Sequence, residues 1–171
     1  MKKIGIFYGS TTGNTYKVAQ KLASLLKVSP NDTYDISRVA PAVVGEYDVL
    51  LFGSSTWGAG DLQEDWFDFS AAIKAMNLSD KTIAVFGTGN EKMVKTFCNA
   101  VGKISDMAGS TGARLIGQFN AEGYTFKSSA AQMEGLPLMK GLVLDEGNHP
   151  ELTDKRLKEW AQLIIEETAA E

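Results

Sequence analysis

The sequence predicts an α/β fold, a three-layer sandwich in which helices cover both faces of a parallel sheet. Short apolar runs alternate along the chain with segments whose apolar residues recur at helical spacing, which is typical of strand–helix–strand units. The strongest run, at 49–52, is apolar at every position, as expected of a central parallel strand that is buried on both faces. The 171 residues suit a single domain, which we expect to span 1–171.

The first half of the chain is expected to contain the strands 4–8, 34–36 and 49–52, of which 34–36 carries the weakest signal. The helix after 4–8 has an apolar face formed by Val18, Leu22, Leu25 and Leu26. The helix after 49–52 has an apolar face formed by Trp66, Phe69, Ile73 and Met76. Both faces are expected to pack against the sheet.

The second half continues the alternation, with a buried strand at 82–86. A helical stripe follows and ends near Gly109 and Gly112; it consists of Phe97, Val101, Ile104 and Ala108. Two strand-like pieces, 114–119 and 142–144, flank a polar stretch, and we interpret them as one last strand interrupted by an insertion of roughly 20 residues at 120–140. The final helix carries Leu157, Trp160, Ala161 and Ile164, with Thr153 as the expected N-cap.

Composition argues against several classes of function. The net charge of −4 disfavours nucleic acid and anionic membranes as partners. No apolar run approaches the ~20 residues of a membrane span, and the run after the N-terminus is too short for a signal peptide. The single cysteine, Cys98, cannot form an internal disulfide, which fits a cytoplasmic protein. One cysteine and one histidine are too few for a zinc or iron–sulfur site, so we expect no metal.

Three strand ends are rich in small and hydroxyl-bearing residues, namely 9–15, 53–58 and 87–90. Ligands of open parallel sheets bind at the carboxyl ends of the strands. We therefore expect these three segments to converge on one ligand.

The first of these segments predicts a phosphate-binding loop. It leads from a strand into a helix, where backbone N–H groups lack partners and the helix dipole favours an anion. The candidate ligands are Ser10, Thr11, Thr12, Gly13, Asn14 and Thr15. A simple N-terminal cap would need one hydroxyl, whereas this loop has four. Asn14 stands where a nucleoside-triphosphatase loop has its lysine, and Lys92 where a dinucleotide-binding motif has its third glycine, so neither function is expected.

Trp57 is expected to stack on a planar ligand, because it follows a buried strand and is flanked by small residues. The alternative is packing over the edge of the sheet. Trp66 and Trp160 lie on apolar helical stripes and are expected in the core. A phosphate cradle beside an aromatic wall, in a chain without a metal cluster, indicates flavin mononucleotide (FMN) or a similar ligand.

With these motifs the sequence resembles the flavodoxins of the long-chain type over nearly its whole length. The resemblance is carried by the segments 10–15, 56–66, 86–90, 97–102, 122–126, 141–146 and 152–156. It implies a five-stranded parallel sheet of strand order 2-1-3-4-5, with the last strand split by the insertion. It also implies a monomeric, low-potential carrier that moves one electron at a time on non-covalently bound FMN, with no catalytic residue of its own.

By the same resemblance, residues 10–15 hold the FMN phosphate and two further loops contact the isoalloxazine ring. The expected ring contacts are Ser54, Ser55, Thr56, Trp57, Gly58 and Ala59 in one loop and Thr88, Gly89 and Asn90 in the other. Met93, Phe97 and Cys98 complete the expected cofactor-binding residues. Gly58 is expected to let its peptide flip toward the reduced ring. We expect the thiol of Cys98 to be buried and inert.

The chain departs from many relatives beside the expected ring. Residues 90–96 contain no aromatic residue where relatives place a tyrosine, so either Met93 lies against the ring or it begins the next helical stripe. Asn90, Asn99 and Gly147 stand where relatives often carry acids. Because nearby negative charge disfavours the anionic reduced flavin, we expect the last reduction step to be less strongly reducing than in those relatives.

Four acids beside the expected ring predict a docking surface for a basic reductase or electron acceptor. They are Asp61, Glu64, Asp65 and Asp68. The helix dipole also favours acids in a first turn, and both explanations can hold together.

Two rival functions share this kind of sheet. A flavin-dependent reductase of small quinones would need an exposed ring face, which the missing aromatic residue after Asn90 leaves open. A receiver-type signalling module would need acids after the first strand, where this chain has serine and threonine. The lone histidine, His149, lies in a turn-like segment and is expected to be a solvated loop residue.

Overall fold

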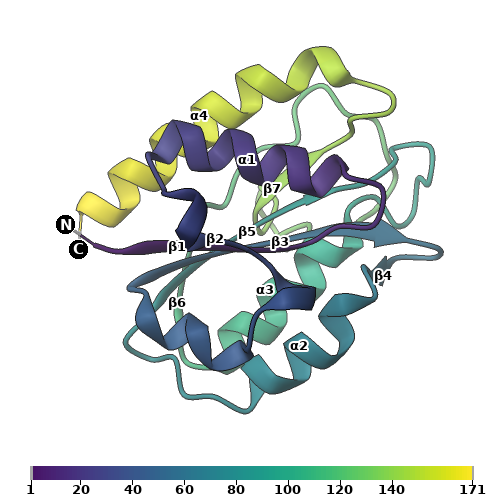
Figure 1. Ribbon diagram of the computed structural model, residues 1–171. Coiled ribbons are helices and arrows are strands. Elements are labelled where there is room, and N and C mark those ends of the chain that lie inside the picture. Colours follow the sequence, from purple (N-terminus) through teal and green to yellow (C-terminus); the bar gives the residue numbers. More distant parts are fainter. Residues whose placement is uncertain (1, 171) are drawn as a thin grey trace.

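A computed structural model describes residues 2–170, so the predicted limits 1 and 171 lie outside the described residues (Figure 1). The strands are β1 (Ile4–Gly9), β2 (Thr33–Asp35), β3 (Val49–Trp57), β4 (Asp61–Leu62), β5 (Thr82–Thr88), β6 (Arg114–Ile116) and β7 (Leu142–Leu144). The α-helices are α1 (Asn14–Leu26), α2 (Asp65–Lys74), α3 (Asn99–Ser110) and α4 (Pro150–Ala169). Three 3₁₀ turns, η1 (Pro30–Asp32), η2 (Ile36–Arg38) and η3 (Pro41–Glu46), flank β2 and precede β3.

The sheet has the order β2-β1-β3-β5-β6, with parallel pairing throughout this path. β7 pairs with β5 in parallel, Phe86 facing Leu142, beyond the point where β6 pairs with β5. β6 and β7 therefore form the two halves of one interrupted edge strand, and the predicted order 2-1-3-4-5 is confirmed. The sequence did not predict the short β4, which pairs antiparallel with the end of β3.

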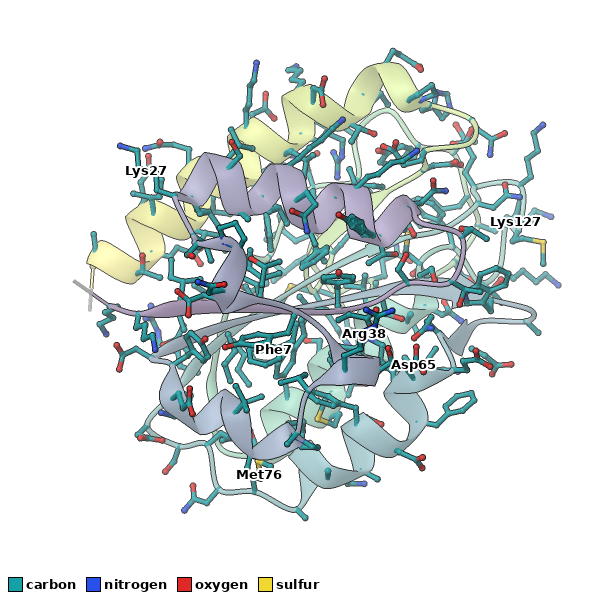
Figure 2. All side chains as sticks on the ribbon, viewed as in Figure 1. Phe7, Lys27, Arg38, Asp65, Met76 and Lys127 are labelled. Carbon is teal, nitrogen blue, oxygen red and sulfur yellow. The ribbon has the colours of Figure 1, made fainter. Side chains whose placement is uncertain are left out.

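The two faces of the sheet bury two separate cores. Phe7 of β1 points to the layer of α2 and α3, which also contains the buried Trp66 (Figure 2). Its neighbour Ile6 points to the layer of α1 and α4, together with the buried Trp160. This alternation follows from the two-residue period of a strand, and it confirms the predicted three layers and the core positions of both tryptophans. None of the helices within 2–170 is long and apolar enough to cross a membrane.

Several predicted boundaries were wrong. β3 continues through residues 53–57, which were expected to form a loop, because they still pair with β1, β5 and β4. β6 ends at Ile116 rather than at 119, because Gly117 adopts a left-handed φ of +81°. The N–H of Gly117 donates to Glu167 (2.8 Å) and its carbonyl accepts from Trp160 Nε1 (2.8 Å), so neither group remains in the ladder.

Three helix predictions also need correction. Thr153 is not the N-cap of α4: that position is His149, and the buried Thr153 hydroxyl donates to Glu146 from within the first turn. Phe97 lies outside α3, because the helix begins at Asn99 and its N-cap, Cys98, has a left-handed backbone conformation. Met76 packs against the core but lies beyond the end of α2.

The insertion between β6 and β7 forms neither a helix nor a strand. It nevertheless adds Tyr124, Ala131 and Met139 to the core on the side of α2 and α3. Its backbone approaches α3 so closely that a Cβ at Gly102 would lie 2.1 Å from the Ala130 carbonyl oxygen. The insertion is thus an ordered part of the fold.

Candidate functional site

The carboxyl ends of β1, β3 and β5 bring the three predicted loops together. The hydroxyls of Thr15 and Thr88 lie 3.3 Å apart, although 73 positions separate them in the sequence. A depression of about 150 Å³ opens between the loops. It is lined by Thr12, Asn14, Ser55, Thr56, Trp57, Thr88, Gly89, Asn90, Glu146 and Gly147.

The loop between β1 and α1 presents several free donors. Among the described residues, the backbone N–H groups of Thr11, Thr12, Asn14 and Thr15 have no protein acceptor. Ser10 turns its hydroxyl inward instead, accepting from the N–H groups of residues 13 and 16 at 3.2 and 3.3 Å. These free N–H groups at the N-terminus of a 13-residue helix form a site suited to an anion.

The loop is braced from the β3 side by the buried Gln63. Its Nε2 donates to the Thr11 hydroxyl at 3.1 Å and to Asp65 Oδ2 at 2.8 Å. Its backbone N–H donates to the hydroxyl of the buried Ser54 at 3.2 Å. Ser54 therefore supports the site from beneath and does not line the depression.

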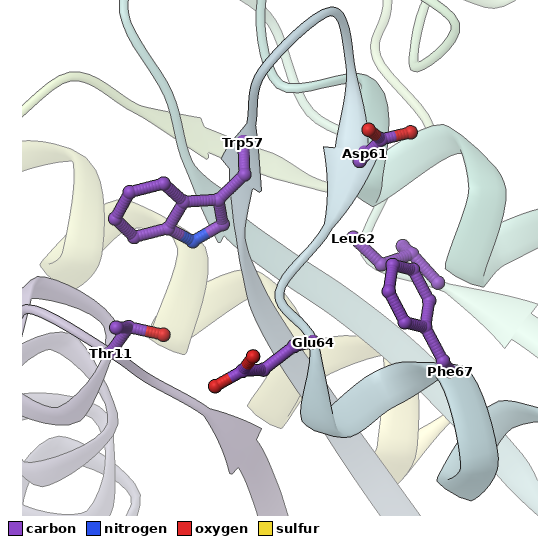
Figure 3. A pocket seen from close by; sticks show the side chains of 6 residues that line it. All are labelled: Thr11, Trp57, Asp61, Leu62, Glu64 and Phe67. Atoms are coloured by element: carbon purple, nitrogen blue, oxygen red, sulfur yellow. The ribbon is translucent and has the colours of Figure 1, made fainter.

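Trp57 stands at the end of β3 with 40% of its surface exposed. Its indole Nε1 donates to the Ser55 hydroxyl at 2.7 Å, which fixes the direction of the ring. The indole points toward Thr11 and Glu64, away from Phe67 (Figure 3). Trp57 lines the depression above and also a second one of about 300 Å³, whose other walls are Thr11, Asp61, Leu62, Glu64 and Phe67. It is thus placed as an aromatic wall rather than packed over the sheet edge.

The turn after Trp57 is closed by a hydrogen bond from the Gly60 N–H to the Trp57 carbonyl (3.0 Å). Gly58 has a φ of +51°, and the space beside it contains only Asp61, 3.6 Å from where a Cβ would lie. A glycine at this positive φ also has more backbone freedom than any other residue.

The remaining predicted residues divide into two groups. Met93 is 48% exposed and precedes α3 by several residues, so it does not begin the helical stripe. Phe97 and Cys98 have no exposed surface, and Phe97 packs on Tyr124 and Phe126. The Cys98 thiol is buried, as predicted, and this burial raises its pKa far above the usual range.

The loop that follows β7 was predicted only in part: the resemblance placed Gly147 near the ring, and Glu146 was not predicted as a site residue. Glu146 and Gly147 line the depression, and the buried Asp145 accepts the Glu91 N–H at 2.9 Å. His149 was predicted to be solvated, but its ring contacts Glu91 and Glu151. The available signal was the strand itself: 142–144 ends at the same edge as the other strands, so its following loop belongs to the site.

Comparison with known proteins agrees with this geometry. A family model described as Flavodoxin matches residues 6–160. The chain is 39% identical over 166 residues to a flavodoxin of Buchnera aphidicola, covering 96% of each chain. It is 41% identical over 172 residues to Flavodoxin 1 of Azotobacter vinelandii, covering 98% of each. The structure of Fusobacterium nucleatum flavodoxin bound to flavin mononucleotide superposes with a TM-score of 0.88 at 25% identity, covering 98% of this chain and 99% of that one. The chain belongs to the flavodoxin family.

Proposed function

We propose that this protein binds FMN without a covalent bond and carries electrons singly between a reductase and acceptor proteins. The observation that supports this most directly is the cluster of unpaired N–H groups in the β1–α1 loop, directly beside a depression with an aromatic wall. A ligand that joins a phosphate to a planar ring needs both features: N–H donors for the phosphate and an aromatic side chain to stack on the ring. The flavodoxins of similar structure are bound to FMN.

The residues present fit such a cofactor. The free N–H groups and the hydroxyls of Thr11, Thr12 and Thr15 would hold the phosphate through hydrogen bonds and the helix dipole, since residues 9–15 include no lysine or arginine. Trp57 would stack on the ring, with Ser55, Thr56 and Ala59 beside it. Gly89 and Asn90, which line the depression, would meet the polar edge of the ring. Phe97 and Cys98 would support this arrangement from the core.

Bound FMN supplies the redox chemistry, and the chain's own groups set its environment. The backbone carbonyl of Gly58 would accept a hydrogen bond from an N–H group of the reduced ring, because a glycine peptide can change conformation at little cost. Trp57 would exclude water from one face of the ring. The rim carries no negative charge at Asn90 or Gly147, and the acid among the residues that line the depression is Glu146.

The proposed partner surface combines apolar and acidic groups around Trp57. Phe67 is 57% exposed and lies beside Leu62, while Asp61, Glu64 and Asp68 are exposed around them. Asp65 is partly engaged with Gln63, and Lys103 approaches Asp61 at 3.8 Å. An exposed aromatic centre with an acidic rim suits a basic partner, which it would attract over long range and contact through its apolar groups.

We further propose that the carrier is a single domain that acts as a monomer in the cytoplasm.

Anaerobic stepwise reduction of the protein reconstituted with FMN tests the proposed function. We expect tight binding and a reduction that proceeds in two separated one-electron steps, visible as a distinct long-wavelength absorbance at half reduction. Trp57→Ala should weaken FMN binding about 10- to 100-fold, since stacking of a planar ring is worth about 1–3 kcal/mol. Trp57→Phe is the matched control and should retain most of the affinity. Failure to bind FMN would refute the proposal.

A quinone reductase is the second candidate, because Met93 is largely exposed and Trp57 is the one aromatic residue among the described residues that line the depression. In such an enzyme the flavin would be reduced directly to the two-electron state, without a one-electron intermediate. The enzyme would also turn over with NAD(P)H and a quinone alone. Reduction that requires a separate reductase protein supports the carrier instead.

A further inference from the structure

The imidazole of His149 lies between two carboxylates on different segments. Its Nε2 is 2.6 Å from Oε1 of Glu91, which follows β5, and its Nδ1 is 3.0 Å from Oε1 of Glu151, in the first turn of α4. The Glu91 and His149 side chains are only 15% and 28% exposed. The contact therefore joins the loop after β5 to the start of α4 in a partly shielded place.

This geometry requires a particular protonation state. A neutral imidazole carries one N–H, so it can donate to one of the two carboxylates and must turn a lone pair toward the other. The imidazolium ion carries two N–H groups and can donate to both. Both distances are hydrogen-bond distances, so the arrangement is complete only when His149 is protonated.

The same residues hold the rim of the proposed cofactor site. The Glu91 N–H donates to the Asp145 carboxylate at 2.9 Å, and Glu91 Oε2 accepts the Thr125 N–H at 2.7 Å. Asn148 Nδ2 donates to Asn90 Oδ1 at 2.9 Å. Asn90 lines the depression. The contact of His149 with Glu91 therefore also fixes the position of the adjacent Asn90 at the rim.

The charged groups around the ring favour the cation. From the loop after β5 comes Glu91, from α4 comes Glu151, and beneath them lies the buried Asp145. The insertion contributes Tyr124, whose ring meets that of His149 edge-on and is covered on another side by Arg156 of α4, whose guanidinium carbon lies 4.9 Å from the Tyr124 ring centre. Arg156 and the N-terminus of α4 oppose a positive charge, but the hydrogen bonds that the ring donates to Glu151 and Glu91 prevail and raise the pKa of His149.

We propose that His149 is a positioning residue that holds Asn90 and Glu91 at the rim of the site only while its ring is protonated. The consequence for FMN rests on the proposed function. A group whose pKa is raised by folding stabilises the folded state fully below its unfolded pKa of about 6.5, and this stabilisation is lost as pH rises through the folded pKa. FMN should therefore be held more tightly in mildly acidic solution than in alkaline solution.

The first test uses NMR, because His149 is the one histidine of the chain and its ring signals need no assignment. We expect the titration of wild-type protein to lie above the usual pKa of about 6.5. Glu91→Gln and Glu151→Gln should each lower it, while Glu159→Gln, an equal charge change further along α4, should leave it unchanged. A wild-type pKa at or below the usual value, or no response to Glu91→Gln, would overturn the proposal.

The second test compares FMN dissociation constants of wild type and His149→Gln from about pH 6 to about pH 9. The FMN phosphate titrates in the same way in both proteins, so the ratio of the two dissociation constants reports the effect of His149 alone. We expect the variant to bind at least about threefold more weakly at the acidic end and equally at the alkaline end. Parallel curves would contradict the proposal.

Glu91→Gln, which keeps an acceptor for the Thr125 N–H, serves the same comparison if the histidine variant does not fold. Absence of FMN binding at every pH would refute the proposed function, and the NMR titration would still decide whether the histidine contacts form.

Discussion

At the scale of single residues, the rim of the site depends on polar groups whose partners lie far away in the sequence. Asp145 is 1% exposed, and its carboxylate accepts the N–H groups of Glu91 and Asn148 at 2.9 Å each and the Asn148 side-chain amide at 2.7 Å. A buried carboxylate is tolerated when donors satisfy it in this way. One side chain thereby fixes the loops after β5 and β7 relative to each other.

Asn90 offers a residue-scale prediction about the redox potential. Asn90→Asp keeps the acceptor for the Lys92 N–H (3.0 Å) and for Asn148, while it adds a negative charge at the rim. Because that charge opposes the negative charge gained on reduction, the last reduction potential should become more negative, by on the order of tens of mV at this exposed position. Redox titration of both proteins measures the shift.

Asn77→Asp is the matched control for this experiment. Asn77 also accepts a backbone N–H two residues ahead (3.0 Å), and it lies just before β5, at the opposite end of the strand from the site. This variant should leave the potential unchanged. An equal shift in both variants, or none at Asn90, would show that local charge at the rim does not set the potential.

At the scale of elements, α4 anchors the insertion through Arg156. This guanidinium is 4% exposed and donates to the carbonyls of Val143 (3.2 Å) and Asn120 (2.7 Å). It also lies over the rings of Phe119 and Tyr124. The insertion is therefore held by a planar, multiply donating side chain, which lysine cannot replace.

Arg156→Lys should consequently lower the free energy of unfolding by about 2–3 kcal/mol, because buried carbonyls lose their donors while the charge is retained. Chemical denaturation measures the loss, and hydrogen exchange should accelerate in residues 119–124. The neighbouring, exposed Lys155 provides the control, since Lys155→Arg should alter neither quantity. Wild-type stability in Arg156→Lys would mean that the insertion is held by its apolar contacts alone.

At the scale of the whole molecule, the fold separates stability from function. The two cores lie between the sheet and the helix layers that cover its two faces (Figure 1). The candidate site and the acidic surface lie instead at the carboxyl ends of the strands. Charges at these strand ends can therefore change without loss of core packing, and they can act on a partner before contact through long-range attraction.

Paired neutralisation of Asp61 and Glu64 tests this arrangement. Asp61→Asn with Glu64→Gln should slow electron transfer to a basic partner about tenfold at low ionic strength and flatten its dependence on salt. Stopped-flow kinetics at several salt concentrations provide the measurement. Glu46→Gln with Asp80→Asn removes the same charge from the opposite edge, where β3 and β5 begin, and should have little effect. Equal effects of the two pairs would indicate a dependence on net charge rather than on a docking surface.

The site was predictable in part, because three of its loops carry their own chemistry. Residues 10–15, Trp57 and Thr88 could be predicted as candidate site residues from residue type and from their position after strands, and the structure brings their loops together. Glu146 and Gly147 have no such chemistry of their own: the resemblance alone placed Gly147 beside the ring, and the pairing of β7 with β5 brings both residues to the depression. The Glu91–His149 contact, across 58 positions, likewise has no local signature.

The sequence by itself determined the α/β architecture, the order of the elements and the candidate phosphate-binding loop, since periodicity and loop chemistry are local properties. Only the tertiary structure decided where strands end, as at Gly117 and Trp57, because pairing and side-chain contacts from distant segments override local propensity there. It also decided that the His149 ring contacts Glu91 and Glu151 instead of being a solvated side chain. Such contacts depend on how the chain returns on itself, which no local pattern records.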